Sequence, residues 1–153
     1  MDEKERQARY CFGCGSLNPQ GLHLFFEEEQ GQVRAEFTPQ KEHQGFPGYM
    51  HGGLVTTLMD EAMGWCTVFQ QIWAVTARMN VRFRVPVPLF QPMTVSARIH
   101  KDRRRWVTVR AEVRSQEGEI LAEAESVFMR VPGERKQELD EIYLPVYNRD
   151  GRF

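Results

Sequence analysis

The residues best suited to chemistry lie between Gly48 and Glu61, in the segment Gly-Tyr-Met-His-Gly-Gly-Leu-Val-Thr-Thr-Leu-Met-Asp-Glu. His51, Gly52 and Gly53 stand where a loop turns into a predicted helix. Two adjacent glycines remove both Cβ atoms, so a ligand can approach the backbone closely. The first amides of a helix lack intrahelical acceptors and lie at the positive end of its dipole. These amides are therefore candidate donors to the oxyanion that forms in acyl transfer.

Asp60 follows about two turns further along the same predicted helix and is the candidate catalytic carboxylate. Apolar residues surround this helix, and a buried carboxylate is costly without a partner. The residues on its own face are small or polar, which would leave room for a substrate: Gly53, Thr56, Thr57, Gly64 and Thr67. Side chains lean toward a helix N-terminus, so we expect Asp60 and the glycine amides to face one cavity. Glu61 is the weaker candidate because it shares a face with Leu54, Leu58 and Trp65.

The elements that must position these residues are one helix and several strands. Apolar residues recur at helical spacing over 53–69 and on more than one side, which predicts a buried helix. Strands are predicted in two short segments and four later segments with period-two alternation: 23–28, 32–37, 75–85, 93–99, 107–113 and 120–128. Hairpin turns are predicted at Gln30-Gly31 and at 116–119, which contains Gly118. The alternation assigns Thr76 to the strand face away from Met79 and Phe83.

Together these elements predict an α+β domain in which antiparallel strands have one covered face. A chain of 153 residues is expected to form one domain. Its 20 basic and 21 acidic side chains give a net charge of -1, which argues against a dedicated nucleic-acid binder. No apolar run approaches the roughly 20 residues that cross a bilayer, and the charged first ten residues do not read as a signal peptide. Three cysteines, an odd number, favour a reducing compartment. We expect a cytoplasmic protein without membrane or nucleic-acid partners.

The pattern from His51 to Asp60, His-Gly-Gly, four residues, Leu, one residue, Asp, resembles the signature of hotdog-fold acyl-CoA thioesterases. It is most similar to the phenylacetate-pathway and thioesterase-superfamily-member types, and the likeness covers about residues 11–131. The resemblance implies a hotdog fold, in which a curved antiparallel sheet wraps around one long central helix. It implies hydrolysis of an acyl- or aryl-CoA thioester to the free acid and CoA, without a metal or organic cofactor. It also implies a homodimer or homotetramer whose active sites are shared between subunits.

The same resemblance assigns roles to individual residues. Asp60 acts as general base or nucleophile, Gly52 supplies an oxyanion amide, and His51 orients the turn. Thr76, on the strand that follows the helix, positions the attacking water. Gly53 and Asn80 are assigned to substrate binding. The residues leave two mechanisms open, general-base attack by water and direct attack that forms a mixed anhydride.

The acyl group is also left open by the sequence. Aromatic side chains that could bound an aryl or medium-chain acyl group are Phe46, Trp65, Phe69 and Trp73. Two other functions remain as alternatives: a hotdog hydratase or dehydratase acting on acyl thioesters, and a non-catalytic acyl-CoA-binding module. The hydratase motif usually places its acid before the histidine, whereas here the acid follows it.

A basic run, Lys101 to Arg105, lies between two predicted strands. Coenzyme A carries a diphosphate and a 3′-phosphate, and the forked donors of arginine suit such groups. We therefore assign Arg103, Arg104 and Arg105 to substrate binding. The alternative interpretation is a solvated turn, which is typical of short charge runs.

The two ends of the chain carry weaker signals. Residues 1–21 are predicted to be a leader, 22–132 the hotdog domain, and 133–153 a charged tail without clear periodicity. The leader contains Cys11 and Cys14, but a structural zinc normally takes four ligands, and a thioredoxin-like motif requires a βαβ context. We therefore expect neither a metal nor a redox site.

Overall fold

The computed structural model describes residues 1 and 3–150, and the side chains of these except 145–150. The chain divides into two compact units, one of residues 26–130 and the other of residues 1–25 with 131–153. Every candidate site residue named from the sequence belongs to the larger unit.

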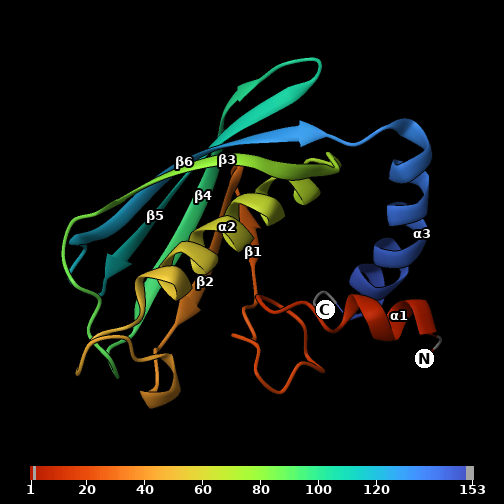
Figure 1. Ribbon diagram of the computed structural model, residues 1–153. Helices are drawn as coiled ribbons and strands as arrows, with labels where there is room; N and C mark the ends of the chain where they lie inside the picture. Colours follow the sequence, from red (N-terminus) through yellow and green to blue (C-terminus); the bar gives the residue numbers. More distant parts are fainter. Residues whose placement is uncertain (2, 151–153) are drawn as a thin grey trace. The chain divides into compact units, whose positions relative to one another are not determined.

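The larger unit is one antiparallel sheet with the long helix α2 (Gly52–Phe69) along one of its faces, as Figure 1 shows. The strands follow the order β1-β2-β4-β5-β6-β3. Their bounds are β1 Glu27–Glu29, β2 Gln32–Phe37, β3 Ala74–Phe83, β4 Met93–Asp102, β5 Trp106–Ser115 and β6 Ile120–Arg130, and a 3-10 helix, η1, spans Lys41–His43. The predicted α+β class and the arrangement of strands around one long helix are confirmed.

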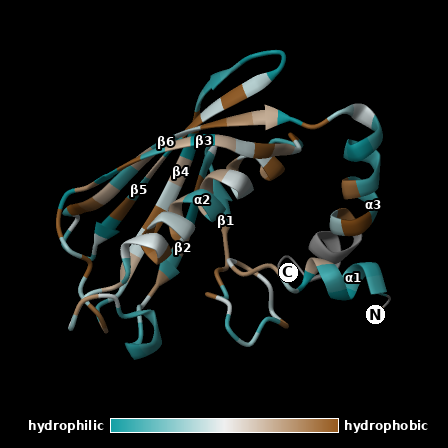
Figure 2. Ribbon diagram, in the orientation of Figure 1, coloured by the Kyte–Doolittle hydropathy of each residue, from teal (hydrophilic) through white to brown (hydrophobic). Residues whose placement is uncertain are grey.

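The core lies between α2 and the sheet because both elements are apolar on the side where they meet. The helix buries Val55, Leu58, Met59, Ala62, Met63, Trp65, Cys66 and Thr67. Alternate residues of the central strands meet it, including Val95, Val107, Val109, Val113 and Phe128. Figure 2 shows apolar and polar residues alternating along these strands. Each buried aliphatic or aromatic side chain contributes about 1.5–3 kcal/mol, so this interface holds α2 in place.

A β-bulge in β3 changes which face Thr76 takes. In the pairing of β3 with β6 the register shifts between Thr76 and Arg78, which leaves Ala77 as an extra residue. Thr76 pairs with Phe128, which is buried against α2, and paired residues point to the same face of a sheet. Thr76 therefore faces α2, on the same side as Met79. The predicted opposite orientation is wrong, because one extra residue reverses the period-two alternation.

The predicted hairpin turns are confirmed. Gln30 and Gly31 have φ values of 53° and 77°, as a two-residue type I′ turn requires. The β5–β6 loop spans residues 116–119 and has Gly118 at φ 88°. The first predicted strand is shorter than expected: β1 begins at Glu27, and His23 has a left-handed φ of 52°.

The smaller unit contains two helices that the sequence analysis did not predict, α1 (Glu3–Ala8) and α3 (Gly133–Asp150). The first turns of α3 carry only charged and polar residues, from Glu134 to Glu138, and Pro145 stands inside its second half, so the sequence did not indicate one continuous helix. Close charge pairs such as Arg135–Glu138 and Lys136–Asp140 support it instead. The domain limits at residues 22 and 132 stay predictions. Within the described part of the chain, no helix has the length and apolar character to cross a membrane.

Candidate active site

His51 caps the N-terminus of α2. Its backbone is extended (φ -61°, ψ 131°), and its Nδ1 atom accepts a hydrogen bond of 2.9 Å from the Gly53 amide. Because Nδ1 is the acceptor, the proton of the neutral imidazole is on Nε2. A Cβ at residue 53 would lie 3.0 Å from Nδ1, so glycine is what allows the imidazole to fold over the helix end. The Gly53 amide, predicted to bind substrate, is thus engaged by His51.

The amide that remains at this helix end is that of Gly52. The amides of Leu54 and Val55 donate to the His51 carbonyl at 2.9 and 3.1 Å, and Gly53 donates to the His51 ring. Among the described residues, no acceptor is found for the Gly52 N–H, and Gly52 is partly exposed. The Gly52 amide is therefore available to a ligand, and its role as an oxyanion donor stays a prediction.

The loop before α2 holds His51 rigidly. The His51 amide donates to the carbonyl of His43 at 2.8 Å, and the Gly48 amide donates to the Gln44 side chain at 3.0 Å. A Cβ at Gly45 would lie 3.0 Å from the His51 Cα, so only glycine lets the loop pass this closely. The cap therefore depends on a loop whose long-range contacts the sequence motif does not reveal.

Asp60 and Thr76 form the second part of the site. The Thr76 hydroxyl donates a hydrogen bond of 2.7 Å to Oδ1 of Asp60, linking β3 to the middle of α2. Asp60 is half-buried and Thr76 is exposed. The contact exists because the bulge at Ala77 turns Thr76 toward the helix. The structure thus brings together two residues that the sequence analysis placed in one site.

Asp60 and Gly52 are not brought together within one chain. Eight residues of helix separate them by about 12 Å along the axis, whereas an oxyanion donor and a catalytic acid each act at about 3 Å. Within a single chain the two groups therefore cannot act on one substrate atom, and the expectation that they face one cavity stays a prediction. Strand β3 runs back along α2: Thr76 contacts Asp60, while a Cβ on Gly52 would lie 3.5 Å from the Phe83 ring.

The helix face around Asp60 is partly open, as the small residues predicted. A Cβ added to Gly64, one turn beyond Asp60, would meet no atom within 4 Å. The hydroxyls of Thr56 and Thr57 each donate at 2.9 Å to the carbonyls four residues earlier. Thr67 differs from the expectation, because it is fully buried.

An apolar hollow of about 940 Å³ adjoins the His51–Gly52 end of α2. Its walls include Phe46, Tyr49 and Phe83, all of them exposed. Of the aromatic residues suggested from the sequence, Phe46 lies in this wall, whereas Trp65 is buried and stacks on Phe26 at 6.1 Å. Phe83 and Tyr49 were missed because nothing in their spacing separates them from core residues.

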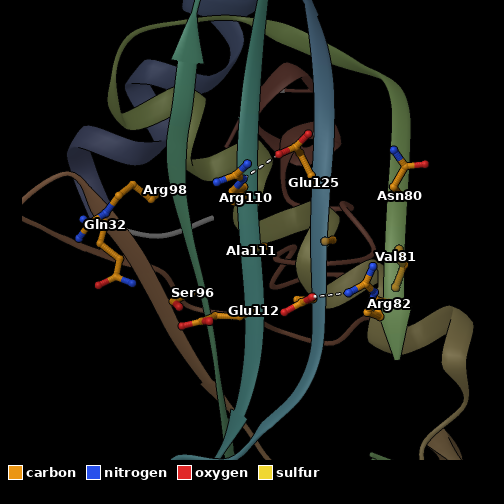
Figure 3. A pocket seen from close by; sticks show the side chains of 12 residues that line it. Gln32, Asn80, Val81, Arg82, Ser96, Arg98, Arg110, Ala111, Glu112 and Glu125 are labelled. Atoms are coloured by element: carbon orange, nitrogen blue, oxygen red, sulfur yellow. Dashed lines mark hydrogen bonds and ion pairs between the residues drawn. The ribbon is translucent and has the colours of Figure 1, made fainter. Parts of the chain in front are cut away.

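Asn80 lies on the opposite face of the sheet. It lines a second hollow, of about 750 Å³, together with charged side chains of four strands (Figure 3). These charges form ion pairs, among them Arg110–Glu125 at 2.7 Å and Arg82–Glu123 at 3.8 Å. Because Asn80 and Thr76 point to opposite faces of β3, the structure does not bring Asn80 to Asp60.

Arg103, Arg104 and Arg105 form the exposed turn between β4 and β5. Backbone hydrogen bonds hold this turn, such as that from the Arg103 amide to the Trp106 carbonyl at 2.9 Å. Strand pairing puts Asp102, Val107, Phe128 and Thr76 in one row across four strands. The basic turn thus lies at the same end of the sheet as Thr76. Three strand spacings, or about 14 Å, separate Thr76 from Asp102, the residue that precedes the turn.

Cys66 is buried on the core side of α2. Burial raises the pKa of its thiol to about 11, so the side chain stays protonated at neutral pH. A thiol in this state is a poor nucleophile.

Comparison with known proteins agrees with this description. The Thioesterase superfamily model matches residues 47–122, a range that contains His51, Asp60 and Thr76. The acyl-coenzyme A thioesterase THEM4 of Mus musculus is 26% identical over 113 residues, which are 73% of this chain and 49% of the mouse protein. The chain thus spans about half the length of the curated relatives it matches.

Solved structures share the fold. The thioesterase superfamily protein RHA08564 superimposes with a TM-score of 0.76 and 27% identity, covering 79% of this chain and 60% of that one. The protein smu.793 of Streptococcus mutans UA159, solved bound to acetyl CoA, gives a TM-score of 0.67 and 21% identity, covering 71% and 88%. Residues 26–130 are therefore a hotdog-fold domain of the thioesterase superfamily.

Proposed function

We propose that this protein is an acyl-CoA thioesterase that hydrolyses an acyl- or aryl-CoA thioester to the free acid and CoA. The observation that carries the proposal is the 2.7 Å hydrogen bond from Thr76 to Asp60, on a helix whose first amide remains available at Gly52. The mouse relative is named an acyl-coenzyme A thioesterase.

The chemistry follows from these groups. The Thr76 hydroxyl holds Oδ1 of Asp60, which leaves Oδ2 to take a proton from water. The water oxygen attacks the thioester carbon, and the Gly52 amide stabilises the carbonyl oxygen as it becomes negative. The C–S bond then breaks, and the Asp60 proton passes to the departing CoA thiolate. In the covalent alternative, Asp60 attacks the carbon itself and water cleaves the resulting anhydride.

The distance between Gly52 and Asp60 supports a site that is shared between two chains. Because about 12 Å of helix separates them, one thioester must receive Gly52 from one chain and Asp60 from another. Strand β3 supplies the surface for this pairing, since it is an edge strand of ten residues. It exposes the apolar side chains of Val75 (58%) and Phe83 (55%), and long apolar edges pair readily with a second strand.

The geometry of such a dimer can be specified. A two-fold axis beside Thr56, midway between Gly52 and Asp60, relates antiparallel α2 helices so that Asp60 faces Gly52 of the partner subunit. The contacts with β3 lead to the same axis, because Thr76 lies beside Asp60 and Phe83 beside Gly52. The β3 strands then pair about a point between Met79 and Asn80. A tetramer would add a second interface to this dimer.

Complementation between two inactive variants tests the activity and the shared site together. Gly52→Pro removes the amide N–H at a helix position that accepts proline, and Asp60→Asn removes the base. Each variant alone should release little thiol from any acyl-CoA in a panel. Mixed after dissociation, they should recover about one quarter of wild-type activity, because half of the dimers are mixed and each has one intact site. A mixture as inactive as its components, with mixed dimers shown by mass spectrometry, would contradict the shared site.

A further inference from the structure

The apolar hollow beside Gly52 has the size and lining of a small-molecule site. Its volume of about 940 Å³ is within the range of ligand pockets. Apolar side chains make up most of its wall, and its one arginine, Arg84, is paired with Glu123 at 2.7 Å. A ligand in the hollow would therefore meet carbon surface and no free charge among the described lining residues.

Phe46 is displayed at the rim of this hollow by a rigid turn. The segment Phe46-Pro47-Gly48-Tyr49 closes with a hydrogen bond of 3.0 Å from the Tyr49 amide to the Phe46 carbonyl, and Gly48 has φ 85°. Proline followed by glycine at positive φ is the pattern of a type II turn. The Gln44 side chain and the Leu89 amide bind Gly48 on either side, at 3.0 Å each. Even so, Phe46 is 85% exposed, so an aromatic ring on a well-held turn stands in solvent beside an apolar hollow.

The position of the Gly52 amide and the polarity of the wall together indicate which part of a substrate enters the hollow. A thioester whose carbonyl oxygen binds this amide has its acyl carbon chain on one side and the pantetheine arm on the other. Pantetheine carries two amides that need polar partners, which an apolar wall does not supply. An acyl chain or aryl ring needs none. We infer that the Phe46 turn and the hollow behind it select extended apolar acyl groups, of medium-chain or aryl type, with Phe46 as the specificity-determining residue.

The inference rests on the proposed thioesterase function, so its test uses binding as well as turnover. Calorimetry would measure the Kd of non-hydrolysable thioether analogues carrying ethyl, hexyl, decyl and benzyl groups on CoA. Wild type should bind the longer and aryl analogues at least about 10-fold more tightly than the ethyl analogue, since each methylene in an apolar pocket is worth about this much. Phe46→Ala should remove most of that preference. Val85→Trp, which fills the hollow, should weaken decyl binding about 10-fold or more relative to ethyl.

Phe90→Ala is the matched control, because Phe90 is 61% exposed but lies outside this hollow. It should keep the wild-type dependence on chain length. The inference would be overturned if the wild type showed no preference for chain length. It would also be overturned if Phe46→Ala weakened the binding of all analogues equally, and that result would assign the hollow to pantetheine. A wild type that binds long analogues tightly but hydrolyses none of the matching thioesters would refute the proposed activity and leave the specificity role supported.

Discussion

The two hollows of the larger unit are similar in size, about 940 and 750 Å³, but opposite in chemistry. The one beside α2 is lined by aromatic and aliphatic side chains and adjoins the amide of Gly52, which has no acceptor within the described part of the chain. The one on the outer face of the sheet is lined by several arginine and glutamate side chains (Figure 3). A volume of this size thus does not by itself indicate a site.

The difference lies in whether the polar groups already have partners. On the outer face, the hydrogen bond from Arg110 lowers the pKa of Glu125, so the two remain an ion pair. Exposed pairs of this kind contribute little and need no ligand. Beside α2 the Gly52 amide has no acceptor among the described residues, and Phe46 stands exposed. The unpaired amide and the exposed aromatic side chain therefore indicate a candidate substrate site better than the volume of the cavity does.

Removing the carboxylate of α2 should have the largest effect. Asp60→Asn is expected to lower kcat by about 10²–10⁴ because the general base is lost, with substrate binding retained. Glu125→Gln on the outer face is the matched control and should change kcat little. Thiol release under saturating acyl-CoA measures both. If Asp60→Asn kept half of the activity while Glu61→Gln had none, the catalytic role would belong to Glu61.

Removing the Gly52 amide should have the next largest effect. Gly52→Pro is expected to lower kcat by about 10²–10³, the usual loss for one oxyanion donor. Gly52→Ala keeps the N–H, and its Cβ would lie at an ordinary 3.5 Å from the Phe83 ring, so it should retain most of the activity. Circular dichroism would verify that both variants fold. Equal losses in the two variants would point to packing at Phe83 as the cause.

Breaking the link between β3 and α2 should have a moderate effect. Thr76→Val removes the hydroxyl that donates to Asp60, and a hydrogen bond to a charged group is worth about 1.5–3 kcal/mol. We expect kcat to fall about 10–100-fold, and Thr76→Ser to restore most of it. Equal losses in Thr76→Val and Thr76→Ser would limit Thr76 to a packing role.

The basic turn should have the smallest effect. Replacing Arg103, Arg104 and Arg105 with alanine is expected to raise KM a few-fold, because exposed charge pairs are worth about 0.2–1 kcal/mol each. Raising the salt concentration should raise the wild-type KM similarly, since the Debye length falls from about 10 Å at 0.1 M to about 3 Å at 1 M.

Two controls separate phosphate binding by this turn from general charge effects. Arg110→Ala on the outer face should leave KM unchanged, and a substrate shortened to its pantetheine arm should respond neither to salt nor to the arginine changes. If the KM values of the shortened and full-length substrates responded alike to salt and to the arginine changes, the turn would be a solvated loop without a role in substrate binding.

Most of the fold could be predicted from the sequence because burial leaves a local period. Helix α2 was predicted from residue 53 to 69 and runs from 52 to 69, and β2 was predicted with its observed limits. The motif likewise indicated His51, Gly52 and Asp60 as site residues, and this assignment stays a prediction. Helix α3 was missed because its first turns are charged and polar throughout and a proline, Pro145, stands inside it, so no apolar period extends over its length.

What the sequence determined by itself was the identity of the groups that could do chemistry and the helix that carries them. Which of these groups meet was decided by the tertiary structure. One extra residue at Ala77 turned Thr76 toward Asp60, and loop contacts folded the His51 ring over Gly53. The length of α2 kept Gly52 away from Asp60 in the same chain. Periodicity reports which side of an element is buried, but contacts between elements depend on strand register and long-range packing, which leave no repeating pattern in the sequence.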